Sequence, residues 1–144
     1  MNYSFKLEKV LNYKENIEDL KKSKYGDINS RVNNEEERLI GFNQHKENLV
    51  VEKNKSVKST SIGNLKLYNS YLQDISVTIQ NQERKIEEMK VELEEAKEEL
   101  LVAMQEKKAF EKLKENDYKE FIIESKRQEE KLLDGIVTFN TSQQ

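Results

Sequence analysis

The sequence contains no cysteine, no proline and no tryptophan, and its 144 residues include only 4 glycines. Without cysteine there is no disulfide framework, no thiolate metal site and no cysteine nucleophile. Compact domains place proline and glycine in their turns, so the scarcity of both predicts few turns and long elements. Hydrophobic residues make up 35% of the chain and charged residues 37%, which leaves too little apolar material for a thick core. Two interpretations remain at this point: a disordered chain, or long helices that bury only a narrow seam.

Long hydrophobic runs and a surplus of basic charge are also absent. No apolar stretch approaches the ~18 residues that a membrane-spanning helix needs. The N-terminus has no continuous apolar centre of the kind found in a signal peptide, so we expect a cytoplasmic protein. The 25 basic and 28 acidic residues are interspersed and give a net charge of −3. A non-specific nucleic-acid binder would instead carry a basic surplus.

The second half of the chain carries a heptad repeat. From Leu65 onward, apolar residues recur in alternating steps of three and four over about six repeats, interrupted only by Gln82 and Lys107. A strict seven-residue repeat makes a helix supercoil around a partner helix, so this seam predicts a coiled coil. The seam positions are Leu65, Tyr68, Leu72, Ile75, Ile79, Gln82, Ile86, Met89, Leu93, Ala96, Leu100, Ala103, Lys107 and Phe110.

A single break divides the chain. The stretch from about residue 54 to 63 is rich in Ser, Thr, Asn and Gly, which favour turns. A first helix is predicted from about residue 4 to 53, with Ser4 as its cap, and a second from about 64 to 139. The sequence therefore predicts a single all-α domain over 1–144, in which two long helices form an antiparallel coiled-coil hairpin. A parallel homodimer of one bent helix is the alternative.

Signals of catalysis or of cofactor binding are missing. His45 is the only histidine, and it lies on a helical stripe, where a surface or seam position accounts for it. Catalytic constellations need several groups that converge in a pocket, and a two-helix rod offers none. The glycines are scattered and form no phosphate loop. We expect a non-enzymatic protein without metal or cofactor.

Two apolar and aromatic stripes flank the predicted turn, and the hairpin brings them together. Each follows helical spacing, and we expect the second to run beside the a/d register, apart from Ile75, which lies on it. Aromatic residues at the edge of a narrow seam are typical of a surface that binds a partner protein. The alternative is that both stripes belong to the internal seam. The stripes are Arg38, Phe42, His45 and Leu49 on the first helix, and Tyr71, Ile75, Thr78 and Gln82 on the second.

The second helix is predicted to be longer than its partner. With the turn centred near residue 58, Phe5 lies opposite about residue 111, and the stretch from Lys114 to Phe139 has no intramolecular partner. This open end carries an apolar stripe, and exposing so much apolar surface is unfavourable. We expect a partner protein, or a second copy, to cover it.

Several segments resemble the flagellar FliJ family of export proteins. The opening from Phe5 to Lys22 resembles the start of that family in its aromatic, aliphatic and alternating charged positions. Residues 68–79 resemble the start of the family's second helix, and 107–113 and 128–134 resemble its C-terminal portion. Gly135 stands where the family often has an acidic residue. The opening residues that carry the resemblance are Phe5, Leu7, Val10, Leu11, Tyr13, Lys14 and Glu15.

The resemblance implies a cytoplasmic component of the flagellar type III export apparatus, associated with the inner membrane. It implies an antiparallel coiled-coil stalk that engages the hexameric export ATPase, the membrane export gate protein and substrate-specific export chaperones. The stripes near the turn are then candidates for binding the gate and the chaperones. The candidates for binding inside the ATPase ring are Phe5, Leu7, Val10, Leu11, Tyr118, Phe121, Ile122, Leu132 and Leu133.

Two other functions stay open from the residues alone. A structural scaffold, such as a homodimer, would self-associate stably without an ATPase. A nucleic-acid-binding helical arm would need lysines along one face, and only Lys46, Lys53, Lys55 and Lys58 near the turn qualify, diluted by nearby Glu47 and Glu52. We expect no nucleic-acid partner.

Overall fold

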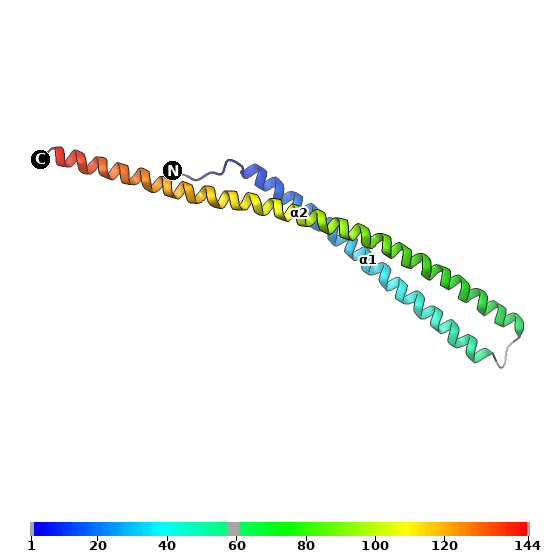
Figure 1. Ribbon diagram of the computed structural model, residues 1–144. Coiled ribbons are helices and arrows are strands. Elements are labelled where there is room, and N and C mark those ends of the chain that lie inside the picture. Colours follow the sequence, from blue (N-terminus) through cyan, green and yellow to red (C-terminus); the bar gives the residue numbers. More distant parts are fainter. Residues whose placement is uncertain (1, 58–60, 144) are drawn as a thin grey trace. The chain divides into compact units, whose positions relative to one another are not determined.

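The computed structural model describes residues 2–57 and 61–143, and it contains two long α-helices (Figure 1). Helix α1 runs over Glu8–Ser56 and α2 over Ile62–Ser142. No strand occurs among the described residues. The predicted all-α antiparallel coiled-coil hairpin is confirmed. Part of the expected turn, residues 58–60 with Lys58, lies outside the described residues.

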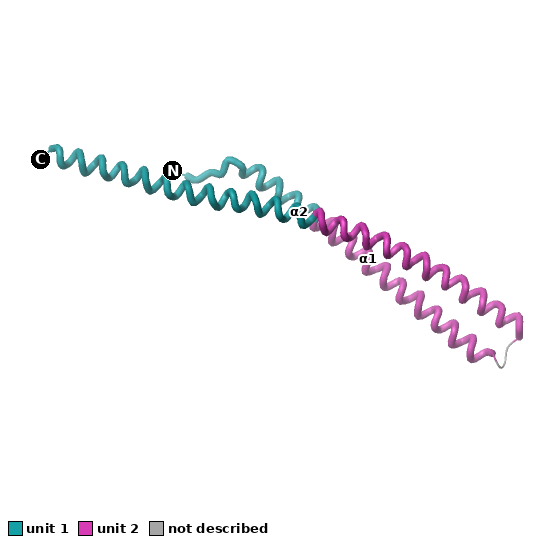
Figure 2. Tube along the Cα trace, in the orientation of Figure 1, with its two compact units in different colours: residues 1–21, 100–144 teal, residues 22–99 magenta. Residues whose placement is uncertain are grey.

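The chain divides into two compact units (Figure 2). The terminal unit comprises residues 1–21 and 100–144, and the turn unit comprises residues 22–99. Pairs of side chains join α1 to α2 within each unit. They are Glu8–Lys114 and Lys14–Glu106 in the terminal unit, and Lys24–Glu99, Glu36–Lys90 and Lys53–Asn69 in the turn unit. Within each unit the numbers rise along α1 as they fall along α2, so the helices are antiparallel.

The predicted seam forms the buried line of α2. Each of its positions from Leu65 to Phe110 is buried or half-buried. In the turn unit Ile28 and Val32 of α1 pack with Ala96 of α2, and Ala96 is only 1% exposed. Tyr25, Met89 and Leu93 pack around this cluster. Because alanine is small, the two helices approach closely here, and the larger Ile28 and Val32 side chains of α1 pack against Ala96.

The two polar residues in the seam have partners on α1. The Gln82 amide donates hydrogen bonds to the carbonyl oxygen of Glu35, at 2.9 Å, and to its carboxylate. Lys107 Nζ lies 2.8 Å from the carboxylate of the buried Glu18. The hydrogen bond from Gln82 lowers the pKa of Glu35, and the ion pair with the Glu18 carboxylate raises the pKa of Lys107. Such polar layers favour one register of a coiled coil, because sliding the helices would leave a buried polar group unpaired.

The helix starts differ from the predicted ones for local reasons. Ser61 is the N-cap of α2: its hydroxyl accepts the N–H of Asn64 and its carbonyl accepts the N–H of Leu65. This cap starts α2 at Ile62. At the other terminus the prediction that Ser4 caps α1 is wrong, since the helix begins at Glu8, whose N–H donates to the carbonyl of Phe5. The residues before Glu8 instead contact α2 through Tyr3.

Candidate partner-binding surfaces

The N-terminal segment before α1 lies against α2 and is held there by Tyr3. The Tyr3 hydroxyl donates to Asp117 Oδ2 at 3.0 Å and lies 3.4 Å from the carbonyl oxygen of Lys114. Its ring lies 5.0 Å from Tyr118 and 5.3 Å from Phe121, measured between centroids. Burial and the hydrogen bond to the Asp117 carboxylate both raise the pKa of Tyr3.

These contacts correct the predicted start of the open end. The expectation that α2 has no intramolecular partner from Lys114 onward is wrong, because Glu8 pairs with Lys114 and Tyr3 reaches Phe121. Counting residues outward from the turn assumes that the whole N-terminus is helical and rises about 1.5 Å per residue. A non-helical chain can span up to ~3.3 Å per residue, so the segment before Glu8 covers more of α2 than the same number of helical residues would.

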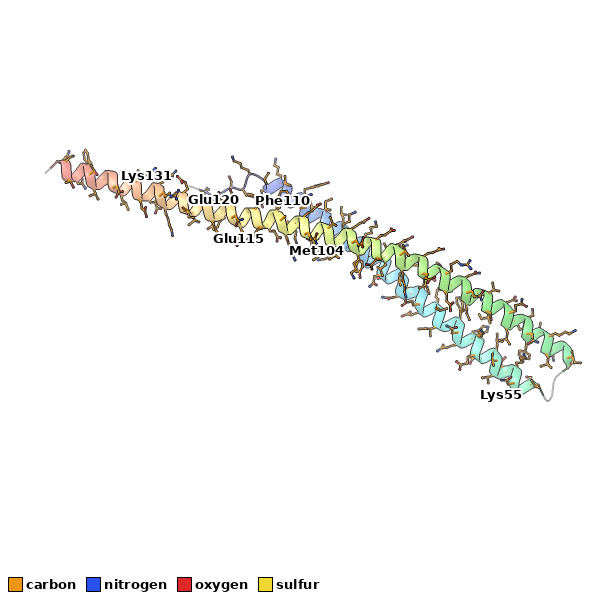
Figure 3. The ribbon with its side chains drawn as sticks, viewed as in Figure 1. Lys55, Met104, Phe110, Glu115, Glu120 and Lys131 are labelled. Carbon is orange, nitrogen blue, oxygen red and sulfur yellow. The ribbon has the colours of Figure 1, made fainter. Side chains whose placement is uncertain are left out.

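The part of α2 without such cover begins further along the chain. Every residue from 126 to 143 is exposed, and we call this stretch the uncovered end. In Figure 1 it extends past the N-terminus, and Figure 3 shows Lys131 on it with no other element alongside. Leu132 is 69% and Leu133 61% exposed, and Ile136, Val137 and Phe139 are exposed as well. The structure therefore leaves an amphipathic helix without a packing partner over this stretch.

The nine residues predicted to bind the ATPase fall into different environments. Leu11 is buried, and Phe5, Val10, Phe121 and Ile122 are half-buried. Leu7, Tyr118, Leu132 and Leu133 are exposed. Phe5, Leu7 and Phe121 line one surface groove, and Leu11 and Tyr118 line another, on which Tyr3 also lies. Leu132 and Leu133 line neither groove.

Tyr3 is the residue that sequence reasoning missed. It contacts Tyr118 and Phe121 of α2, and so connects the N-terminal residues of the predicted ATPase surface to those on α2. An available signal was the pair of aromatic residues, Tyr3 and Phe5, spaced by two. That spacing places both on one side of an extended segment, whereas it would separate them on a helix.

Only some residues of the two stripes near the turn are exposed at the surface. Gln82 is buried and bonded to Glu35, which agrees with its place in the heptad seam. Its assignment to a stripe beside the register is therefore wrong. Phe42, Leu49 and Ile75 are half-buried. Arg38, His45, Tyr71 and Thr78 are exposed, which leaves these four open to a partner.

Local contacts occupy some of these exposed groups. The Arg38 guanidinium lies 5.9 Å from the centroid of the Phe42 ring, a cation–π distance. The Thr78 hydroxyl donates to the carbonyl of Asp74, one turn earlier. Leu49 and Tyr71 line a common pocket, together with Glu52, Asn64, Leu67 and Tyr68. The structure thus joins the two stripes at Leu49 and Tyr71, at the edge of the seam.

Within residues 2–57 and 61–143, no three His, Cys, Asp or Glu side chains are grouped so that they could hold a metal ion. No helix in the described part of the chain combines the length and the apolar character needed to cross a membrane.

Comparison with known proteins decides the family. A family model described as "Flagellar FliJ protein" matches residues 3–144. The chain belongs to this FliJ family. A relative from Bacillus subtilis (strain 168), named "Flagellar FliJ protein", is 31% identical over 137 residues, which cover 94% of this chain and 93% of the relative. No solved structure matches the chain significantly. The resemblance to the flagellar FliJ family, drawn from the opening and from three later segments, is confirmed.

The matched range of the family model includes the N-terminal segment and the uncovered end. The FliJ match starts at residue 3, so it includes Tyr3 and the rest of the segment that lies on α2. It extends to residue 144 and includes the whole uncovered end. Both surfaces therefore belong to the FliJ region of the chain.

Proposed function

We propose that this FliJ-family protein is a cytoplasmic component of the flagellar type III export apparatus, where it serves as a coiled-coil stalk. In this proposal the uncovered end and the neighbouring grooves engage the hexameric export ATPase. The stripes near the turn, without the buried Gln82, engage the membrane export gate protein and the substrate-specific chaperones. The protein acts by binding and carries out no chemical step itself.

The observation that carries the proposal is the uncovered end. An isolated amphipathic helix gains little from its own hydrogen bonds and is stabilised mainly by burying its apolar face. Leu132 and Leu133 are both more than half exposed, and burying each fully would contribute about 1.5–3 kcal/mol. A ring-shaped ATPase with a central channel can surround such a helix on all sides. The central stalk of rotary ATPases is the analogy here.

The experiment that tests this function is retention of the export ATPase on the immobilised full-length chain. We expect the hexamer to be retained, with the chain itself monomeric at the same concentration. Stable self-association of the chain without retention of the ATPase would contradict the stalk and favour the scaffold.

The gate and chaperone surface is tested by a double substitution. We expect Phe42→Ala combined with Tyr71→Ala to weaken binding to the export gate protein by roughly tenfold, because aromatic anchors dominate interfaces. Helical content should stay nearly unchanged, since Tyr71 is exposed and Phe42 only half-buried. Gate binding is measured with the purified proteins, and helicity by circular dichroism.

The matched control for this pair is substitution of Glu94 or Glu98, which are exposed on α2 of the same unit. Either change to alanine should leave gate binding and helicity unaltered. Unfolding of the Phe42→Ala and Tyr71→Ala variant would assign both stripes to the core and remove this surface from the proposal.

A further inference from the structure

Charge is unevenly distributed along the chain. Four lysines, Lys53, Lys55, Lys58 and Lys66, lie between residues 53 and 73, and no Asp or Glu occurs there. With 25 basic and 28 acidic residues in total, the rest of the chain holds 21 basic against 28 acidic. The stretch with the break between the helices is therefore basic in a chain that is otherwise acidic.

The described lysines of this stretch belong to one end of the turn unit. Lys55 lies near the end of α1, beside the break (Figure 3). Lys53, close by on α1, donates to Asn69 of α2, which holds the two helix ends together. Lys66 lies in the first turns of α2 and is exposed, as is Lys55.

Large apolar side chains are exposed among these lysines. Ile62, the first residue of α2, is 74% exposed, and Val57, Leu67 and Tyr71 are about half exposed. None of the four is a seam position. The turn surface, defined as Lys53, Lys55, Val57, Ile62, Lys66 and Leu67, thus combines positive charge with uncovered apolar groups.

We propose that the turn surface binds the interface of an anionic lipid bilayer. Lysines attract the negative headgroups at close range, and their long stems allow the ammonium groups to stay at headgroup level. Ile62, Val57 and Leu67 can then enter the boundary between headgroups and acyl chains, as apolar faces do at interfaces. A polyanion such as RNA would use the lysines alone and leave the exposed Ile62 unexplained. This contact is peripheral and needs no membrane-spanning segment.

The inference goes beyond the proposed function, because its partner is lipid and it is measured without any export protein. It would hold even if the ATPase did not bind. Conversely, a chain that ignores lipid could still engage the ATPase through its uncovered end.

The first test is flotation of the full-length protein with vesicles. We expect binding to vesicles of phosphatidylcholine mixed with phosphatidylglycerol, no binding to phosphatidylcholine alone, and weakening with salt. Each lysine near an anionic surface contributes roughly fivefold in affinity. Lys55→Gln combined with Lys66→Gln should therefore reduce vesicle binding about 25-fold.

The matched control is Lys126→Gln combined with Lys131→Gln, which changes net charge equally on exposed residues of the terminal unit. It should bind vesicles nearly as the unaltered protein does. Equal losses in both variants would show a response to net charge alone and would overturn the proposal, as would an absence of binding to the anionic vesicles.

The second test places a fluorescent reporter at the apolar position. The chain has no tryptophan, so Ile62→Trp introduces a single one at an exposed site. Anionic vesicles should shift its emission to the blue, while Leu132→Trp in the uncovered end should show no shift. Salt-sensitive binding of single-stranded RNA, with no blue shift on vesicles, would overturn the proposal and assign the lysines to a nucleic acid.

Discussion

Leu132→Ser combined with Leu133→Ser is expected to weaken binding to the export ATPase on the order of 100-fold, or more, without altering the hairpin. Both leucines are exposed in the isolated chain, so they add little to its own packing. If the ATPase covers them, each loses the transfer free energy of a leucine side chain, about 1.5–3 kcal/mol. Binding of the labelled chain to the purified hexamer measures the effect, and circular dichroism checks the helical content.

A matched pair of adjacent residues on the same helix gives the control. Leu101 and Val102 are 47% and 53% exposed, and both lie in α2 of the terminal unit, at positions outside the proposed ATPase surface. Leu101→Ser combined with Val102→Ser should leave ATPase binding within about twofold, in line with the small effects of surface substitutions away from a site. If the two pairs weaken binding equally, the ATPase does not recognise the uncovered end.

Val32→Asp is expected to lower the melting temperature of the chain by roughly 10 °C or more. Val32 is 3% exposed and packs with Ile28 and Ala96, so the substitution removes apolar contacts. It also buries a carboxylate among apolar side chains, and the two effects together cost on the order of 3 kcal/mol or more. Thermal denaturation followed by circular dichroism measures the shift.

Val91 provides the same residue type on the exposed side of the coiled coil. It is 60% exposed and lies in the same unit as Val32. Val91→Asp should shift the melting temperature by no more than about 2 °C, because its carboxylate stays in water. Similar melting temperatures for the two variants would contradict the seam described for the turn unit.

The seam could be predicted from the sequence because it depends only on spacing along one helix. Residues such as Ile79, Ile86 and Ala103 recur at heptad positions, and all three are buried. Their periodicity also required a partner helix, which gave the fold class. The single polar and glycine-containing break then indicated where the chain turns.

The partners of the polar seam residues could not be predicted in the same way. Gln82 contacts Glu35 and Lys107 contacts Glu18, and each pair comes from distant parts of the chain. Which residues meet depends on the register between the helices, and long side chains on both can reach more than one position. The sequence marked Gln82 and Lys107 as exceptions without showing what satisfies them.

The N-terminus limited the prediction of the candidate site. Tyr3 lies in a non-helical segment, where helical spacing gives no information on which face of α2 it contacts. A helical count therefore ended the pairing at about residue 111, whereas Tyr3 extends it to Phe121. The sequence predicts that α2 has an end without a partner, but it puts the start of that end at Lys114 rather than at residue 126. The start depends on how far the non-helical N-terminal segment reaches along α2.

Hydrogen exchange of the full-length chain, alone and with the ATPase hexamer, tests the stalk proposal most directly. In the isolated monomer we expect slow exchange from Ile79 to Ala103, where seam residues are buried, and fast exchange from Lys126 onward. Addition of the ATPase should slow exchange in the uncovered end, with no comparable change from Ile79 to Ala103. A complex that forms while the uncovered end still exchanges fast would contradict the proposal. So would slow exchange up to Phe139 in a verified monomer without the ATPase.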